Sequence, residues 1–440
     1  MYGLAEYFLK HGSQVSGSDV IDSEILSELR NQGADIFIGH TPNNIKDDVD
    51  MVVYTAAVKD DNEEYSEAKK KNIKTIKRAE ALGMVVNDKF LIAVSGTHGK
   101  TTTTAMIGKV LIDAGLEPIV FVGGNVPMFN GSAVHIGGGN IAVVEADEYD
   151  KSFLQLTPDM IVVNNIDLDH MDIYKDLKDI VNTFGEFCSL SKKDAKIIYN
   201  GDDVNVRQAI GAVNREKISF GMDEKNYLKV SKINYNDSVL NFSIKNSVAS
   251  YDNISLGLPG KHNVMNSTAC FAVSKLVGIK FEDYKKSISE FKTVDRRLQL
   301  KLMNKRIKVY DDYAHHPVEI SMSLQALRDS NPNKKIISVF QPHLYSRTKD
   351  LYKEFADALV NADEVILLDI YPAREKPIEG VTSQLILNEM NTENPKVKYI
   401  HDKISLMSEL KKHENENAVI VFQGAGNITK LCDEFINYIT

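Results

Sequence analysis

The sequence predicts an α/β protein built from three consecutive segments. Short apolar stretches that end in polar residues alternate with helical patterns along most of the 440 residues, as in sheets covered by helices. A glycine-containing loop with Lys100 lies between a strand-like and a helical stretch. A chain of this length corresponds to about three domains of ordinary size. We place them at residues 1–86, 87–297 and 298–440.

Composition and charge exclude several classes of protein. With 43% apolar and 26% charged residues the chain can bury several cores, and its net charge of −9 disfavours nucleic acid as the main partner. Three scattered cysteines do not make a disulfide framework, which favours a reducing, cytoplasmic location. No apolar run approaches the roughly 18 residues that span a bilayer, so we expect no membrane insertion.

The first segment has the pattern of a small Rossmann-like unit. Helical spacing over residues 3–11 and 23–32 alternates with strand-like stretches at 14–18, 35–38 and 51–55. A nucleotide-binding unit of this type normally opens with an apolar strand and a glycine turn. This chain begins at the helix that follows them, so the first strand of the expected sheet is missing.

The strongest motif lies at the start of the second segment, which we interpret as a P-loop ATPase-like domain. An apolar strand at residues 91–95 leads into a glycine loop and a helix over 103–114, the order that a phosphate loop requires. Backbone amides and the positive end of the helix would hold phosphate oxygens. Val94 stands where the usual first glycine would be. The predicted ATP-binding loop residues are Gly96, Thr97, His98, Gly99, Lys100, Thr101 and Thr102.

Two acidic runs in the same segment each follow an apolar strand. Glu145 ends the strand at 141–145, and the strand at 160–164 leads to a run of acids around His170. Carboxylates at these strand ends, with the Thr101 hydroxyl, suit Mg²⁺. The first run equally fits a solvated first turn of a helix, and a lone histidine is more often structural than a metal ligand.

The rest of the second segment offers weaker signals. Residues 217–256 alternate apolar and polar positions, which we interpret as an antiparallel insertion. Asn263 and Asn266 are three residues apart, so they share a helix face and can hydrogen-bond a base or phosphate, or simply cap the helix. Arg297, after Arg296, can reach phosphates across a cleft, although a surface position fits it as well.

The third segment again has the pattern of a Rossmann-like sheet. Strand-like stretches at 307–310, 336–340, 364–368 and 418–422 alternate with helical ones at 318–328, 351–359 and 429–438. Polar clusters follow the first two strands, one around Asp312, His315 and His316 and one around His343 and Arg347. Titratable groups at adjacent strand ends indicate a functional site.

Taken together, these motifs resemble the Mur ligase family of bacterial cell-wall synthesis, over essentially the whole chain. They occur in the family's order: GTHGKTTT, EADEYDKSF, NIDLDHMDIY, PGKHNVMNSTA, RRLQ, DDYAHHPVEI, FQPHLYSRT and GAGNI. DDYAHHP together with FQPHLYSRT is similar to the alanine-adding members of the family.

The resemblance implies an ATP-dependent ligase of peptidoglycan synthesis, and so a part in cell shape and division. Such an enzyme joins L-alanine to the lactyl carboxylate of UDP-N-acetylmuramate through an acyl phosphate, with Mg²⁺ and ATP. We expect a monomer or a weak homodimer. At matching positions the resemblance implies three groups of site residues: for catalysis Lys100, Glu145, His170, Arg297 and Asp312; for metal Thr101, Glu145 and His170; and for ATP beyond the loop Asn263, Asn266, Arg297 and Asp312.

The resemblance also implies where the other substrates bind. His343 and Arg347 would face the amino acid, with Arg347 suited to its carboxylate. Ser18, Asp19, His40 and Thr55 would line the uridine-nucleotide side. His315, His316 and His343 are candidates for the base that deprotonates the amine, and the sequence does not rank them.

The amino terminus departs from the family pattern. Members usually begin with a strand and a glycine-rich turn, and Met1 to Glu6 align only with the end of that stretch. We expect the natural protein to start about twenty residues upstream, the length of a strand-plus-turn unit.

Two other functions compete with this interpretation. One is a related ligase that attaches a recycled peptide to the same sugar nucleotide, or a folate or cyanophycin relative. The other is a nucleotide-binding regulatory protein without turnover, whose mark would be a replaced Lys100, Glu145 or Asp312. All three residues are present.

Overall fold

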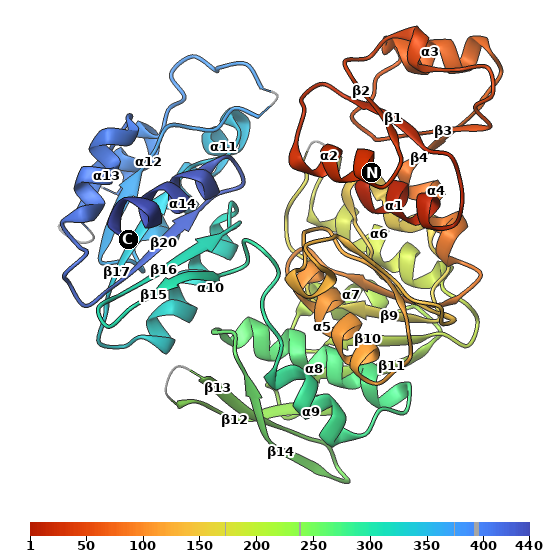
Figure 1. The fold of residues 1–440 in the computed structure, drawn as a ribbon. Coiled ribbons are helices and arrows are strands. Elements are labelled where there is room, and N and C mark those ends of the chain that lie inside the picture. The colour runs from red at the N-terminus through yellow and green to blue at the C-terminus, as the bar shows by residue number, and fades with distance from the viewer. Residues whose placement is uncertain (172, 237–238, 374, 391–395) are drawn as a thin grey trace. The chain divides into compact units, whose positions relative to one another are not determined.

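The computed structural model describes residues 1–171, 173–236, 239–373, 375–390 and 396–440 (Figure 1). The chain forms two compact units. The first comprises residues 1–230, 245–249 and 265–287, and the second comprises 231–244, 250–264 and 288–440. Most of the first two predicted segments lie in the first unit and the third lies in the second, while the two boundaries between the segments stay a prediction.

The N-terminal segment contains two separate pairs of parallel strands, β1 with β2 and β3 with β4. Its helices begin at side-chain caps where the sequence supplies them: Ser23 accepts from the amide of Leu26 and Asn62 from that of Tyr65. The elements are α1 (Tyr2–Lys10), β1 (Ser16–Asp19), α2 (Glu24–Asn31), β2 (Asp35–Ile38), η1 (Pro42–Asn44), β3 (Met51–Tyr54), α3 (Glu63–Lys70), β4 (Lys74–Lys77) and α4 (Arg78–Val86).

The central sheet has ten strands in the order β14-β13-β12-β11-β10-β9-β5-β8-β6-β7. Strand β5 lies between β8 and β9 and is parallel to both, so the carboxyl ends of all three meet at one edge. The strands are β5 (Phe90–Ser95), β6 (Ile119–Phe121), β7 (Val134–Ile136), β8 (Ile141–Glu145), β9 (Met160–Val163), β10 (Lys196–Asn200), β11 (Glu216–Gly221), β12 (Leu228–Asn236), β13 (Val239–Lys245) and β14 (Ser250–Leu256).

Helices connect these strands and cover the sheet. They are α5 (Lys100–Asp113), η2 (Pro127–Phe129), η3 (Tyr149–Gln155), α6 (Leu177–Leu190), α7 (Val204–Ile210), α8 (Lys261–Leu276) and α9 (Phe281–Ser289). Strands β5, β8 and β9 are almost wholly buried, as their continuous apolar sequences require. One apolar core joins them to α6 and to Leu4 of α1.

The predicted antiparallel insertion is wrong at its start. Strand β11 pairs in parallel with β10 along Lys196–Asn200 and in parallel with β12 at Phe220 and Gly221. Alternating polar and apolar residues indicate that one face of a strand is solvated. They do not determine whether the strand runs parallel or antiparallel to its neighbour. The first strand of the expected insertion therefore belongs to the parallel part of the sheet.

The second unit contains a six-stranded sheet in the order β15-β16-β20-β17-β18-β19, parallel except for the antiparallel pair β15 and β16. The strands are β15 (Gln299–Met303), β16 (Ile307–Asp312), β17 (Lys335–Phe340), β18 (Glu364–Leu367), β19 (Lys396–Tyr399) and β20 (Ala418–Gln423). The helices are α10 (Pro317–Ser330), α11 (Tyr345–Leu359), α12 (Gln384–Glu389), α13 (Lys403–Lys411) and α14 (Ile428–Ile439).

Both faces of this sheet are covered by apolar cores. Ile336 and Phe340 of β17 join the core that contains α10 and α11, whereas Ile337 and Val339 join the core that contains α13 and α14. Successive side chains of a strand point to opposite faces, so one apolar strand serves both cores. The predicted Rossmann-like α/β arrangement of the third segment is confirmed.

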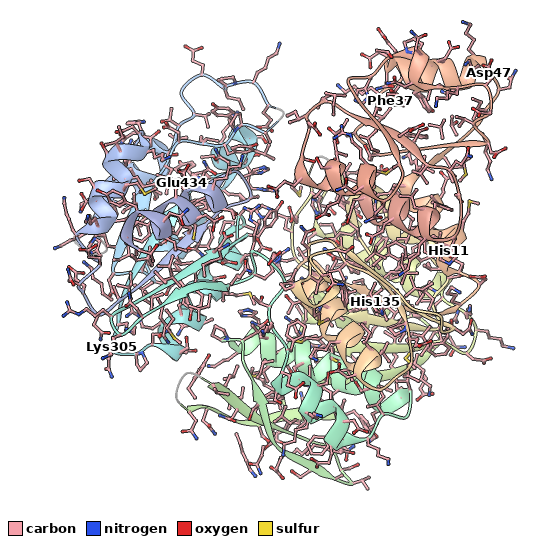
Figure 2. The ribbon with its side chains drawn as sticks, in the orientation of Figure 1. His11, Phe37, Asp47, His135, Lys305 and Glu434 are labelled. Carbon is pink, nitrogen blue, oxygen red and sulfur yellow. The ribbon has the colours of Figure 1, made fainter. Side chains whose placement is uncertain are left out.

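Two histidines labelled in Figure 2 have structural surroundings. His11 stacks on Tyr7 at the end of α1, with ring centroids 4.0 Å apart, and His135 of β7 packs against Phe129 at 5.4 Å. Burial lowers the pKa of His135, which keeps it neutral. Within the described ranges, we find no helix with the length and hydropathy to cross a bilayer.

Candidate functional site

The loop between β5 and α5 has the backbone of a phosphate loop. Gly96 and Gly99 have φ values of +136° and +82°, which side chains rarely allow. A Cβ on Gly99 would lie 2.6 Å from Oδ1 of Asn266, and one on Gly96 would lie 3.0 Å from Cβ of Asn164. The loop therefore needs glycine at both positions. It leads directly into the N-terminus of α5, where backbone N–H groups are open to phosphate oxygens.

The segment after β9 holds this loop in place. Asn165 accepts a hydrogen bond from the amide of His98 at 2.7 Å and donates one to its carbonyl at 3.0 Å. The amide of Thr97 donates to the carbonyl of Asn165, and its hydroxyl accepts from the amide of Asp167. These hydrogen bonds fix the backbone of the loop at Thr97 and His98, whose role in ATP binding stays a prediction.

Lys100 is directed back onto the loop and a neighbouring carboxylate. Its ammonium lies 2.7 and 2.9 Å from the two carboxylate oxygens of Glu148 and 2.7 Å from the carbonyl of Gly96. Burial of the ammonium acts to lower its pKa, but the negative charges of Glu148, Asp147 and Glu145 outweigh it, so the pKa of Lys100 is raised. Lys100 is therefore a cation at the point where phosphates would arrive.

Thr101 and Glu145 come together as predicted. The Thr101 hydroxyl donates to Oε1 of Glu145 at 3.0 Å, and the amide of Gly123 donates to Oε2 at 2.6 Å. A hydroxyl and a carboxylate side by side are the hard oxygen ligands that Mg²⁺ takes. The first turn of α5 also contains the buried Thr102.

His170 lies beside different carboxylates. Its Nε2 is 3.8 Å from Oε1 of Glu148 and 3.8 Å from Oδ2 of Asp169. Its backbone has φ +56°, and its ring packs against Tyr149 with centroids 5.2 Å apart. Glu148 thus connects His170 to Lys100.

Asn263 and Asn266 lie in the first turns of α8, as expected. Asn263 is buried, and its amide donates to the carbonyl of Pro259 at 2.7 Å. Asn266 belongs to the first unit, and its carbonyl oxygen is the one that a side chain on Gly99 would meet. Asn266 is therefore part of the wall of the phosphate loop.

Arg297 and Asp312 belong to the second unit. Asp312 ends β16 with 4% of its surface exposed, and it accepts from the amide of Leu298 at 3.2 Å and from Gln423 at 3.4 Å. Burial raises the pKa of Asp312, against its hydrogen bonds and the nearby Arg297. The Arg297 guanidinium is 3.7 Å from Glu319 and lies over the ring of Tyr313.

His343 and Arg347 follow β17 at the start of α11. The rings of His343 and His315 have centroids 5.9 Å apart, and Nδ1 of His343 is buried with no hydrogen-bond partner among the described residues. Burial, His315 and Arg347 lower the pKa of His343 to about 4. Burial likewise lowers the pKa of His315. Both imidazoles are therefore neutral at pH 7.

The predicted residues on the uridine side gather only in part. Ser18 is 2.9 Å from Nδ1 of His40 and donates to Glu64 at 2.6 Å, so β1, the loop after β2 and α3 meet there. Asp19 accepts from the amide of Val20 at 2.7 Å and closes its own turn. Thr55 follows β3, and its carbonyl accepts from the amide of Val58.

Three site neighbours were missing from the predicted set. Glu148 holds Lys100, Asn165 holds His98, and Glu64 holds Ser18. Glu148 stands three residues after Glu145 in the same acidic run, which was a usable signal. No sequence signal pointed to Glu64, because it lies in α3, a helix that the pattern of apolar residues did not predict.

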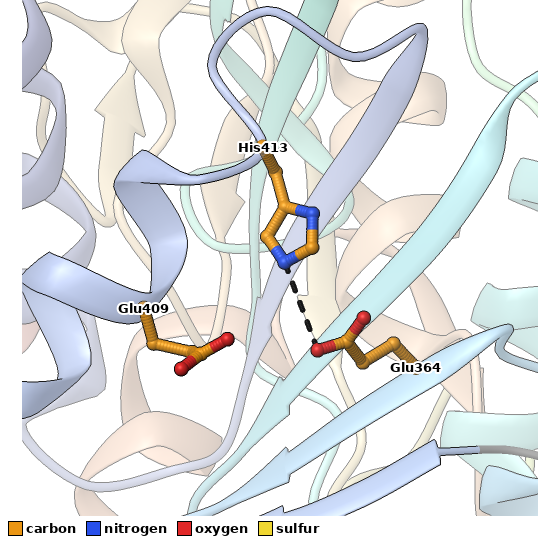
Figure 3. A group of neighbouring side chains, drawn as sticks. All are labelled: Glu364, Glu409 and His413. Carbon is orange, nitrogen blue, oxygen red and sulfur yellow. Dashed lines mark ion pairs between the residues drawn. The ribbon is translucent and has the colours of Figure 1, made fainter.

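A second cluster of ionisable groups lies in the C-terminal sheet, away from every predicted residue of the site within that unit. Glu364 begins β18, and Glu409 and His413 come from α13 and the turn after it (Figure 3). The Lys398 ammonium lies between the two carboxylates, 2.9 Å from Glu364 and 2.6 Å from Glu409, and Lys335 is 3.0 Å from Glu364. Lysines therefore occupy the position that a cation would take, and the cluster is a structural ion-pair network.

We expect Glu364→Gln to destabilise the protein by about 2 kcal/mol at pH 7, discounted for the partly exposed lysines. Hydrogen bonds from Lys398 and Lys335 outweigh the effect of burial and lower the pKa of Glu364 from 4.5 to about 2. The stabilisation is thus complete above pH 4.5 and is lost as the pH falls from 4.5 towards 2. Denaturant unfolding between pH 3 and pH 7 measures it.

Glu416→Gln is the matched control, since its exposed carboxylate pairs with the same Lys335 at 3.3 Å and with Nδ1 of His413 at 2.9 Å but does not contact Lys398 in the described residues. We expect it to change the free energy of unfolding by less than about 0.5 kcal/mol. Two results would contradict a stabilising role for the network. One is an equal loss of unfolding free energy in the two variants, and the other is a loss in Glu364→Gln that is as large at pH 3 as at pH 7.

Three family descriptions match the sequence in order along the chain. "Mur ligase family, catalytic domain" matches residues 1–90, "Mur ligase middle domain" matches 94–274, and "Mur ligase, glutamate ligase domain" matches 296–426. The second match contains the phosphate loop, and the third contains Asp312, His343 and Arg347.

Relatives and solved structures agree with these matches. UDP-N-acetylmuramate–L-alanine ligase of Clostridium botulinum (strain Langeland / NCTC 10281 / Type F) is 40% identical over 99% of this chain and 95% of its own. The same-named protein of Aquifex aeolicus (strain VF5) is 38% identical over 100% and 95%. The crystal structure of UDP-N-acetylmuramate-alanine ligase MurC from Thermotoga maritima matches with a TM-score of 0.85 at 27% identity, covering 100% of this chain and 96% of that one.

A more distant structure shares the fold alone. The murein peptide ligase mpl from Psychrobacter arcticus 273-4 has a TM-score of 0.71 at 20% identity, over 99% of this chain and 96% of its own. Matches along all three parts of the sequence, with relatives near 40% identity over almost the whole chain, show that this protein belongs to the Mur ligase family.

Proposed function

We propose that this chain is an ATP-dependent ligase that joins L-alanine to the lactyl carboxylate of UDP-N-acetylmuramate. The observation that carries the proposal is the phosphate loop with a cationic Lys100, in a chain 40% identical to proteins named for this reaction. The predicted α/β fold and the family resemblance are both confirmed.

The first chemical step uses the residues around the phosphate loop. A carboxylate resists attack by an amine, so one of its oxygens first attacks the γ-phosphorus of ATP, and the bond to the β-phosphate oxygen breaks. The products are an acyl phosphate and ADP. Lys100 and the amides at the start of α5 offset the charge that moves onto the β-phosphate oxygens.

A divalent cation fits beside this loop. Thr101 and Glu145 already place a hydroxyl and a carboxylate oxygen 3.0 Å apart, whereas the imidazole of His170 lies beside Glu148 and Asp169. Mg²⁺ bound there would neutralise charge on the β- and γ-phosphates.

In the second step the amine of alanine attacks the acyl carbon, and inorganic phosphate leaves. Arg347 suits the alanine carboxylate, because its planar guanidinium can donate two parallel hydrogen bonds. Alanine arrives as an ammonium and must lose a proton. The neutral rings of His315 and His343 can accept it, since burial lowers the pKa of both.

The remaining predicted residues would bind the two nucleotides. Asn263, Asn266, Arg297 and Asp312 would contact ATP, and Ser18, Asp19, His40 and Thr55 would contact the uridine nucleotide. Ser18 and His40 support this assignment because they already share a polar cluster with Glu64.

The test is ADP release by the purified 440-residue chain with Mg²⁺, ATP and UDP-N-acetylmuramate, as the amino acid is varied. We expect release that depends on both alanine and the sugar nucleotide, with a product heavier by one alanyl residue. A recycled tripeptide that gives faster release than alanine would favour the peptide ligase instead. ATP binding without acid-dependent or amine-dependent ADP release would favour a regulatory protein.

A further inference from the structure

Every proton of the Lys100 ammonium has an acceptor inside the protein. The acceptors are the two Glu148 oxygens at 2.7 and 2.9 Å, the Gly96 carbonyl at 2.7 Å and the Thr97 carbonyl at 3.3 Å. An ammonium carries three donors, so none remains for a phosphate. The exposed fractions of the Lys100 and Glu148 side chains are 11% and 3%.

The backbone holds Glu148 firmly in this position. The Tyr174 hydroxyl donates to the Glu148 carbonyl at 2.6 Å, and the amide of Lys151 donates to the same carbonyl at 3.0 Å. Asp150 and Lys151 have φ values of +52° and +53°, in the left-handed region, and His170 beside Glu148 has +56°. Non-glycine residues persist in this region where the surroundings enforce it, often at functional sites. The main chain at Glu148 is thus held in place, and its carboxylate, 3% exposed, is not a surface group.

A bound nucleotide and Glu148 would compete for Lys100. In a phosphate loop the lysine reaches the β- and γ-phosphate oxygens. A carboxylate oxygen 2.7 Å from its nitrogen would compete with one of those phosphate oxygens. Two anions cannot share one buried ammonium without a cost, so the phosphates must displace Glu148.

We propose that Glu148 is a positioning residue that holds Lys100 as an internal substitute for a phosphate oxygen, and that nucleotide binding breaks this ion pair. The proposal rests on the proposed function only in assigning a nucleotide to the loop. It makes Glu148 a determinant of nucleotide affinity. Glu148 also gives the buried ammonium of Lys100 an anionic partner when no nucleotide is bound.

The test compares ADP binding by calorimetry in EDTA, so that no metal ion takes part. Glu148→Gln keeps the shape of the side chain and removes its charge, and we expect the Kd for ADP to fall about tenfold, since a charge-assisted hydrogen bond no longer has to be broken. Asp150→Asn is the matched control. It removes a carboxylate two positions away that pairs with Lys77, and asparagine tolerates its positive φ. We expect its Kd to stay within about twofold of the original.

A double-mutant cycle separates displacement from simple repulsion. In a Lys100→Met background, Glu148→Gln should improve ADP affinity by less than about threefold, because the pair is already broken. If Glu148→Gln does not fold, Glu148→Asp, which withdraws the carboxylate by one methylene, takes its place with an expected gain of about threefold.

Three results would overturn the proposal: unchanged ADP affinity in the Glu148 variant, weaker affinity, or an equal gain in the Lys100→Met background. These outcomes are independent of catalysis. The protein could bind added ADP and give the expected double-mutant cycle, yet form no ADP from ATP when alanine is present. That result would reject the proposed function and leave the role of Glu148 intact.

Discussion

Replacing Lys100 with methionine is expected to lower alanine-dependent ADP release by about 1,000-fold, the scale of losing a group that stabilises transferred charge. Methionine keeps the length and apolar stem of lysine and removes only the cation. The variant leaves Glu148 buried without its ion-pair partner, so we also expect a lower melting temperature. Steady-state kinetics at saturating ATP, with circular dichroism to show that the chain is folded, measures both effects.

Lys109→Met is the matched control because it makes the same change on the same helix. The Lys109 ammonium pairs with Asp113 one turn further along α5, at 2.6 Å, and does not contact the phosphate loop. We expect its turnover to stay within about twofold of the original. Full turnover in folded Lys100→Met, or equal losses in the two variants, would mean that the loop does not handle the transferred phosphate.

The strands that carry the site were predictable because their signal is local. The stretches predicted at 91–95, 141–145 and 160–164 match β5, β8 and β9 to within one residue at either end. Each is a continuous apolar run bounded by polar residues, as in strands buried on both faces. The turn into α5 was equally clear, since side chains rarely allow the backbone that Gly96 and Gly99 adopt.

Parts of the N-terminal segment were not predictable on the same grounds. Strand β1 begins at Ser16, two residues later than expected, and α3 and β4 were not predicted at all. Helix α3 has a single buried residue, Ala68, so it shows almost no apolar periodicity. A short element that is mostly solvated is fixed by its cap at Asn62 and by tertiary contacts, and a pattern of apolar residues does not reveal it.

The partners of the site residues depend on the fold. Glu148 meets Lys100 across 48 residues, and Glu64 meets Ser18 across 46. The first pair follows from strand order, because β8 lies next to β5 and delivers the acidic run to the edge where the loop begins. Residue types and spacing predicted Lys100 and Glu145. Glu148 lies in the same acidic run, but only the pairing of strands shows that it meets Lys100.

Arg347→Lys is expected to raise the KM for alanine about 100-fold and to change kcat by less than about threefold. Arg347 lies in the first turn of α11, the helix that follows β17 after residues 341–344, and its charge lowers the pKa of His343. A guanidinium can donate two parallel hydrogen bonds to a carboxylate, whereas an ammonium acts as a point charge and loses that geometry. An interaction that stabilises the bound substrate and the transition state equally affects only KM. Its loss raises KM and leaves kcat unchanged. Initial rates over a range of alanine concentrations separate the two constants.

Arg328→Lys provides the control, on a helix of the same unit. Arg328 lies in the last turn of α10 and pairs with Asp363 at 2.7 Å, with a third of its side chain exposed, so the same substitution there should leave both constants unchanged. The KM for ATP should also stay constant in Arg347→Lys, because this arginine would hold the amino acid and not the nucleotide. A rise in the KM for ATP without one for alanine would instead place Arg347 on the nucleotide, and His343 would then lose its assigned role beside the incoming amine.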